Sequence, residues 1–320
     1  MKRLLAIVMA LCAAFAQAQA QTNYPNRSIR VIVPFPPGGP TDLLARLIAD
    51  RLSTSLGQSF VVDNRPGATG TIGTAMLARA APDGYTILMA STSSHIAAYM
   101  YRSVPYDVEK DVAPIIRTAL LPFYFAVHPA VPATNMRELI ALAKQKPGEL
   151  SYASPGAGSG GHLCTENLRS LAGIDLLHIP FKGAAPGVAA LVAGDVKMIC
   201  DTLSTTHPQV RAGKLRGLAI SGRHRMQAAP EIPTLTESGL ADFDLSLWFG
   251  MFGTGGTPAP ILARLNEEIG RILATPELQS RLTTMGGEAP SNSVEQFSEF
   301  LRADIPRWVK LIRDTGAKVE

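Results

Sequence analysis

Residues 29–56 read IRVIV-PFPPGGP-TDLLARLIADRLSTSL and contain one complete β-loop-α unit. Four of the first five residues are β-branched, which predicts a strand, and residues 41–56 carry leucine and isoleucine at helical spacing. Gly38 and Gly39 stand directly before the predicted helix. The unit predicts an α/β protein in which loops at strand ends lead into helix N-termini.

Similar units follow along the chain. Strand-like segments at 85–89, 150–153 and 196–199 each precede a polar or glycine-rich loop, and the last third is predicted to be helical. Such alternation favours largely parallel strands covered by helices. The chain has 320 residues, of which 46% are hydrophobic. A chain of this length usually exceeds one compact core, so either two domains or one large α/β domain is expected.

The N-terminus predicts export. Lys2-Arg3, an apolar stretch and an Ala-x-Ala site ending at Ala20 are typical of a cleaved signal peptide over residues 1–20. No later stretch reaches the ~18 apolar residues of a membrane helix, so no membrane insertion is expected. Cleavage leaves Cys164 and Cys200, which could form a disulfide or be two buried small side chains; both interpretations stay open.

Charge and histidine spacing exclude two classes of function. The formal net charge is +4, and two of these charges belong to the leader. Without a clustered basic run, the sequence gives no indication of nucleic-acid binding. The six histidines show no metal-ligand spacing, so neither a metal nor a cofactor is expected.

Two loops are candidate anion sites. In the first, Gly38 and Gly39 let the backbone approach a ligand at a helix N-terminus, and Thr41 or Asp42 can cap that helix. Asp42 would compete with an anion, so a structural role is expected for it. Pro37 and Pro40 remove two N–H donors. The alternative is a tight turn with an ordinary cap.

The second loop, 154–162, reads SPGAGSGGH and offers successive N–H groups and hydroxyls to a carboxylate or phosphate. It also fits G-x-G-x-x-G, but Lys182 stands where a dinucleotide site needs an acid. A nucleophile elbow around Ser159 fits except for Ala157, so a secreted serine hydrolase remains an alternative. Polar residues also follow other predicted strands, at 91–95, 181–184 and 200–202. These loops are expected either to face the same crevice or only to cap helices.

The chain resembles the extracytoplasmic receptors of tripartite tricarboxylate transporters, the Bug receptors, from about Tyr24 to its C-terminus. The motifs that carry the resemblance are PF-x-x-GG-x-x-D at 34–42, VDNRPGA at 62–68, PDGYT at 82–86, residues 152–163, IPFKG at 179–183, PTL at 233–235 and GTPAP at 256–260. The resemblance implies a two-lobed type II periplasmic-binding-protein fold with a ligand cleft between two α/β domains. We predict domain I over 21–121 plus 236–320 and domain II over 122–235, with connections near 122–128 and near 215–221 or 247–252.

The resemblance also implies a function without catalysis. Such a receptor is periplasmic, binds a small organic carboxylate (a di- or tricarboxylate or an aromatic acid), acts as a monomer, and delivers its ligand to a cognate integral-membrane permease. A receptor for an uncharged or cationic solute is a further alternative, because Asp201 would favour an amine. The predicted ligand-binding residues are Phe35, Gly38, Gly39, Thr41, Thr92, Ser94, His95, Ser154, Gly156, Gly158, Ser159, Gly160, His162, Lys182 and Asp201.

Overall fold

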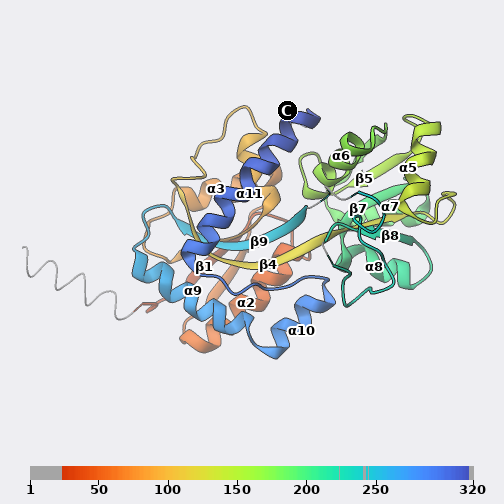
Figure 1. Cartoon of the computed structure of the whole chain (residues 1–320). Coiled ribbons are helices and arrows are strands. Elements are labelled where there is room, and N and C mark those ends of the chain that lie inside the picture. The colour runs from red at the N-terminus through yellow and green to blue at the C-terminus, as the bar shows by residue number, and fades with distance from the viewer. Residues whose placement is uncertain (1–23, 223, 241–242, 244, 317–320) are drawn as a thin grey trace, which may run out of the picture.

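The computed structural model describes residues 24–222, 224–240, 243 and 245–316 (Figure 1). The predicted signal peptide, 1–20, lies outside the described residues. Within these residues, none of the helices combines the length and the apolar character needed to cross a bilayer.

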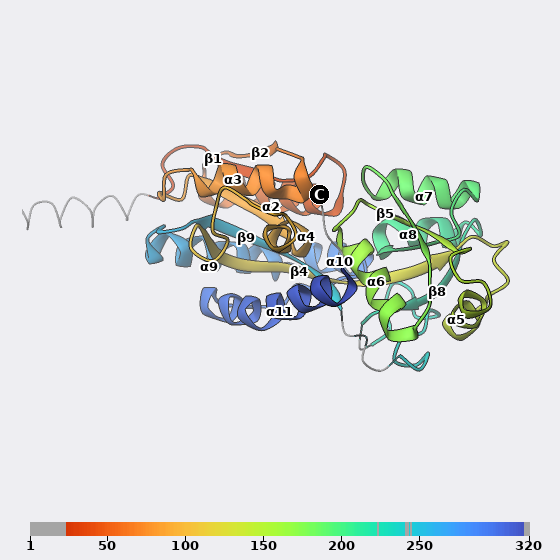
Figure 2. The same ribbon diagram turned by 90° about the horizontal axis from the view of Figure 1, so that it is seen from above.

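Two groups of strands share the long strand β4 (Val112–Val127). We call the group ordered β2-β1-β3-β9-β4, with its helices, the first lobe, and the group ordered β6-β5-β7-β4-β8 the second lobe. The lobes lie side by side along β4 (Figures 1 and 2). The predicted α/β class and two-lobed arrangement are confirmed.

The first lobe contains β1 (Ile29–Val33), α2 (Pro40–Leu56), β2 (Phe60–Asn64), η1 (Ala68–Gly70), α3 (Thr71–Ala78), β3 (Thr86–Ser91), α4 (Thr92–Ile96), η2 (Ala97–Tyr99), β9 (Ser246–Thr254), α9 (Ala259–Leu273), α10 (Pro276–Thr284) and α11 (Val294–Thr315). The second lobe contains α5 (Met136–Gln145), β5 (Ser151–Ser154), α6 (Gly160–Ala172), β6 (Leu177–Pro180), α7 (Ala184–Ala193), β7 (Met198–Thr202), α8 (Leu203–Arg211) and β8 (Arg216–Ile220).

Strand direction brings the carboxyl ends of the parallel strands of both lobes toward their junction. In the first lobe β1 is parallel to β2 and β3, and β9 returns antiparallel between β3 and β4. In the second lobe β5 is parallel to β6 and β7, and β4 runs antiparallel to β7. Parallel strands present their loops at one edge, where ligands of open α/β sheets bind.

The strand β4 changes partners in mid-course. Pro122 pairs with Ser246 of β9, whereas Phe123 pairs with Thr202 of β7. This change supports the predicted boundary at 121–122. The predicted second boundary, 235–236, is supported less well, because Phe243 packs edge-on against Phe125 of the second lobe. We place that crossing at the start of β9; both boundaries remain predictions.

Buried apolar side chains fill each lobe and also the junction. One cluster lies under α2 and α9 in the first lobe, and another lies around α7 and α8 in the second. A third runs from one lobe to the other through Phe123 and Trp248. The carboxylate of Asp304 accepts the indole N–H groups of both Trp248 and Trp308 at 2.9 Å. The junction strands are therefore held firmly against α11.

A disulfide links helix α6 of the second lobe to the central strand β7. Cys164 of α6 and Cys200 of β7 are paired, with their Cα atoms 6.6 Å apart and both side chains fully buried. Of the two interpretations left open by the sequence, the structure shows the disulfide. It fixes the start of α6 beside the end of β7.

Candidate functional site

Loops from both lobes meet at the junction. The N–H of Gly160, the first residue of α6, donates to the hydroxyl of Ser93 in α4 at 2.9 Å. Figure 2 shows α6 beside α11 at the same junction, where the two helices are in contact. The predicted β3 and β5 loops are therefore brought together. Ser93 was missed as a site residue because the run 91–95 offers several similar hydroxyls.

The first loop ends at the N-terminus of α2, and its cap differs from the expected one. Gly39 is the N-cap, and neither Thr41 nor Asp42 occupies the cap position, so that prediction is wrong. Asp42 Oδ2 instead accepts the N–H of Gly38 at 2.9 Å and the Arg46 Nε–H at 3.0 Å, and Asp42 Oδ1 accepts the Asn64 amide at 2.9 Å. The structural role expected of Asp42 is confirmed.

These contacts also control the charge of Asp42. Burial alone would raise the pKa of this carboxyl, but the hydrogen bonds from Arg46, Gly38 and Asn64 together lower its pKa below the ordinary value. The carboxylate is thus ionised and committed to protein donors. The Asp42 carboxylate therefore fixes the conformation of the loop. The groups that donate hydrogen bonds to it compensate its negative charge close to the helix N-terminus.

The first loop leaves several donors for a ligand. Among the described residues, no partner is present for the N–H groups of Gly39, Thr41 and Asp42 or for the hydroxyl of Thr41, which lies in a buried side chain. Phe35 is half-buried, and its carbonyl accepts the Asn64 amide at 3.1 Å. Free N–H groups at a helix N-terminus, together with the helix dipole, favour an anion.

The second loop ends at the N-terminus of α6. The Ser159 hydroxyl accepts the N–H of His162 at 3.3 Å and caps the helix. Gly156 and Gly158 have φ angles of 140° and 74°, a region that favours glycine. A Cβ on Gly161 would lie 2.3 Å from the carbonyl oxygen of Cys200, so only glycine fits this close approach.

Most N–H groups of the second loop already have partners. Gly156 donates to the Ser154 hydroxyl at 3.2 Å, and Gly158 donates to His162 Nδ1 at 3.1 Å. With Gly160 bonded to Ser93, these three glycines shape the loop and do not offer free N–H groups. Within the described residues, the N–H groups of Ala157 and Gly161 have no partner. Sequence motifs could not show which amides stay free.

Three predicted ligand-binding residues after β3 make contacts inside the protein. The Thr92 hydroxyl accepts the N–H of Trp248 at 2.9 Å, and the Ser94 hydroxyl accepts the N–H of Ser91 at 3.1 Å. The ring of His95 packs against Trp248 and Phe252 with centroids 5.5 and 5.3 Å away. Burial lowers the pKa of His95 to about 4. Their side chains contribute contacts within the first lobe.

The remaining two candidates flank the second loop. Lys182 is exposed, and its neighbours Phe181 and Gly183 donate to the carbonyls of Ser154 and Pro155, both at 3.0 Å. Asp201, at the end of β7, is only 6% exposed. Its Oδ1 accepts the N–H of Thr202 at 2.6 Å, while Oδ2 has no partner among the described residues.

Burial raises the pKa of Asp201 to about 6, although the N–H of Thr202 and the nearby hydroxyls of Thr202 and Thr205 oppose this shift. At mildly acidic pH, the Asp201 carboxyl is therefore protonated in a large fraction of the molecules. Its Oδ2 atom remains able to accept a hydrogen bond or, when protonated, to donate one.

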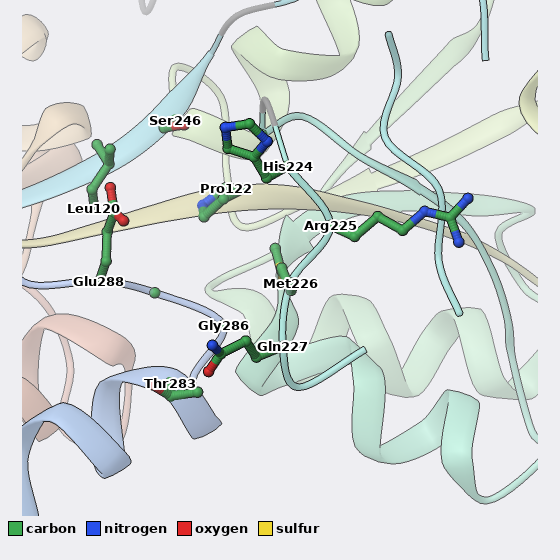
Figure 3. Close-up of a pocket in the computed structure, with 12 residues that line it drawn as sticks. Leu120, Pro122, His224, Arg225, Met226, Gln227, Ser246, Thr283, Gly286 and Glu288 are labelled. Carbon is green, nitrogen blue, oxygen red and sulfur yellow. The ribbon is translucent and has the colours of Figure 1, made fainter. Parts of the chain in front are cut away.

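A cavity of about 450 Å³ lies elsewhere at the junction (Figure 3). It adjoins the edge of β4 at which Leu120 forms a bridge to Glu288. No predicted site residue is among those that line it, which are Leu120, Pro122, Gly222, His224, Arg225, Met226, Gln227, Ser246, Thr283, Gly286, Gly287 and Glu288. This cavity is distinct from the two loops.

The geometry offers no support for a hydrolase. The Ser159 hydroxyl accepts a backbone N–H, and the neighbouring imidazole of His162 uses Nδ1 to accept the N–H of Gly158. Ser154 contacts His178 Nε2 at 2.7 Å, but the Ser154 side chain is fully buried. Neither serine is an exposed nucleophile next to a free base. The described residues also contain no cluster able to hold a metal ion.

Known proteins resemble the chain over nearly its whole length. BugT of Bordetella pertussis is 36% identical over 324 residues, which cover 100% of this chain and 99% of BugT. A solved structure of an R. palustris protein with adipate is 35% identical, with a TM-score of 0.87 over 92% of this chain and 100% of that chain. The malate-bound structure of MatC from Rhodopseudomonas palustris is 31% identical, with a TM-score of 0.83 over 90% and 100% of the two chains.

The fold is accordingly that of the type II periplasmic solute-binding proteins. Residues 44–317 match the model of the tripartite tricarboxylate transporter family receptor. This family consists of binding proteins that serve transporters, and the serine-hydrolase alternative is therefore rejected. By its sequence and its fold, the chain belongs to the tripartite tricarboxylate transporter receptor family.

Proposed function

We propose that this receptor binds a small organic dicarboxylate between its lobes, with one carboxylate held by the free N–H groups of α2 and α6. The single observation that carries the proposal is the set of unpartnered donors at these two helix N-termini. Related structures contain adipate and malate, which are both dicarboxylates. We further propose that the protein works in the periplasm as a monomer and delivers its ligand to a cognate membrane permease.

The donors are sufficient for this task. Hydrogen bonds to a charged group contribute roughly 1.5–3 kcal/mol each, and a micromolar dissociation constant needs about 8 kcal/mol. Because α2 and α6 belong to different lobes, a ligand gains both sets of contacts only when the lobes are close together. Ligand binding would then shift the population toward the closed arrangement.

Replacing Thr41 with valine is expected to weaken carboxylate binding about tenfold, because the variant removes one hydroxyl donor to a charged group without changing side-chain size. Isothermal titration calorimetry would measure the dissociation constant. Thr118→Val is a matched control, since Thr118 is fully buried and its hydroxyl faces the Met89 sulfur. Equal losses in both variants would contradict a role for Thr41 in binding.

A thermal-shift panel tests the proposed ligand class. Adipate, malate, amino acids and aromatic acids would each be compared with the corresponding neutral esters or amides. A ligand that binds the native state raises the melting temperature, so acids should stabilise the protein and their neutral forms should not. Stabilisation by neutral or cationic solutes alone would contradict a carboxylate site.

Asp201 could distinguish hydroxy or amino acids from plain dicarboxylates within the panel. If the buried Oδ2 atom meets the ligand, a hydroxy or amino acid should bind more tightly than the plain dicarboxylate of equal length. Asp201→Asn would then reduce that preference several-fold, because it removes the negative charge and one acceptor oxygen. An unchanged preference in the variant would exclude Asp201 from the specificity of the site.

A further inference from the structure

Three flat rings are stacked beneath the second loop. His178 of β6 lies between Tyr152 of β5 and His162 of α6, with ring centroids 4.8 and 4.1 Å away and interplanar angles of 17° and 15°. The Tyr152 hydroxyl donates to Glu166 Oε1 at 2.5 Å. Glu166 in turn pairs with Arg169 at 2.9 Å. The stack is thus anchored at one side to α6.

The two imidazoles each hold one part of the loop. His162 Nδ1 accepts the N–H of Gly158 at 3.1 Å, which requires a neutral ring with its proton on Nε2. His178 Nε2 lies 2.7 Å from the Ser154 hydroxyl. That hydroxyl also contacts the carbonyl and the N–H of Gly156 at 3.1 and 3.2 Å.

All contacts of Ser154 are satisfied at once by a single proton arrangement. If His178 carries its proton on Nε2, it donates to the Ser154 hydroxyl, which then donates to the Gly156 carbonyl and accepts the Gly156 N–H. Burial and the neighbouring His162 lower the pKa of His178 to about 4, which agrees with a neutral ring. Ser154 is thereby fixed in one rotamer at the start of the loop.

We propose that His178 is a positioning residue for carboxylate binding. It contacts Ser154 and stacks on His162, and these two contacts set the conformation of the second loop. In that conformation the N–H groups of Ala157 and Gly161 face the ligand. His178 itself does not touch the ligand. The inference rests on the proposed carboxylate site and adds a residue outside the predicted set. The anchored stack would restrain a loop that has glycine at 156, 158, 160 and 161.

A double-mutant cycle tests the route through Ser154. His178→Phe keeps an aromatic ring in the stack but removes the nitrogen, and Ser154→Ala removes the hydroxyl. Each single variant should weaken binding of the tightest acid of the panel about five- to tenfold. The combined variant should lose no more than the worse single variant, because both break the same contact. Independent, multiplying losses, or an unchanged affinity in His178→Phe, would overturn the proposal.

Amide hydrogen exchange gives a readout that needs no ligand. In the ligand-free protein, His178→Phe should increase exchange at Gly156 and Gly158 at least fivefold while the melting temperature changes little. His128→Phe is a matched control, since His128 caps a turn after β4 by accepting the Ala130 N–H. Unchanged loop exchange would overturn the proposal. If the unmodified protein bound none of the acids, the proposed function would fail, and exchange would still decide the role of His178.

Discussion

Loss of the Cys164–Cys200 disulfide is expected to lower the free energy of unfolding by about 4 kcal/mol. The bridge joins residues 36 positions apart, and in the chain-entropy account a crosslink of this span removes about that much conformational freedom from the unfolded chain. For a chain of this size, the melting temperature should fall by roughly 6 °C. The loss should also reach the second loop, because the disulfide fixes α6 beside β7.

Two forms of the protein separate the crosslink from the packing of its sulfur atoms. The reduced wild type keeps both buried sulfurs, whereas Cys164→Ala with Cys200→Ala loses them as well. Urea unfolding followed by tryptophan fluorescence would give the free energy of each form. A reduced protein that unfolds at the same urea concentration as the oxidised one would show that the bridge contributes nothing to stability.

The sequence predicted best those features that depend on local chemistry. The strand at 29–33, the glycine turn and the helix from 41 onward follow from periodicity and from what glycine permits before a helix, and the structure has all three. The structural role of Asp42 followed from simple electrostatics, since an unpaired carboxylate would repel an anion at that place.

Features that depend on tertiary packing could not be predicted. In the run 91–95, Ser93 rather than Ser94 or His95 reaches the other lobe, because the short helix α4 turns His95 toward Trp248. Likewise, a run of glycines predicts a close backbone approach but does not tell which amides are used internally. The Gly158 amide is occupied by Nδ1 of His162, whose ring stacks on His178 and near Tyr152.

His95 is expected to make the protein less stable in acid. Burial against aromatic rings lowers its pKa from 6.5 to about 4, so the unfolded chain takes up a proton before the folded protein does. The stability that depends on a neutral His95 is complete above about pH 6.5, the ordinary value, and is lost as the pH falls toward 4. This difference in pKa between the unfolded and the folded protein lowers the free energy of unfolding by about 3 kcal/mol at pH 4.

The unfolding free energy of the wild type alone would not reveal this contribution, because Asp201 acts in the opposite direction. Its pKa is raised to about 6, so the folded protein takes up this proton first and gains stability as the pH falls from about 6 toward 4. The two contributions overlap in the same pH range. A variant is therefore needed to separate them.

His95→Phe keeps a ring between Trp248 and Phe252 and removes the titrating group. The unfolding free energy of both proteins would be measured in urea without ligand, at pH 7.5, 5 and 4. We expect similar values at pH 7.5 and a gap that widens by about 3 kcal/mol at pH 4, with the variant more stable. Asp201→Asn should shift the gap the other way, because it removes the stabilising proton uptake. If the free energies of unfolding of wild type and His95→Phe changed with pH in parallel, His95 would be protonated as easily in the folded protein as in the unfolded chain. The packing of its ring would then not exclude water.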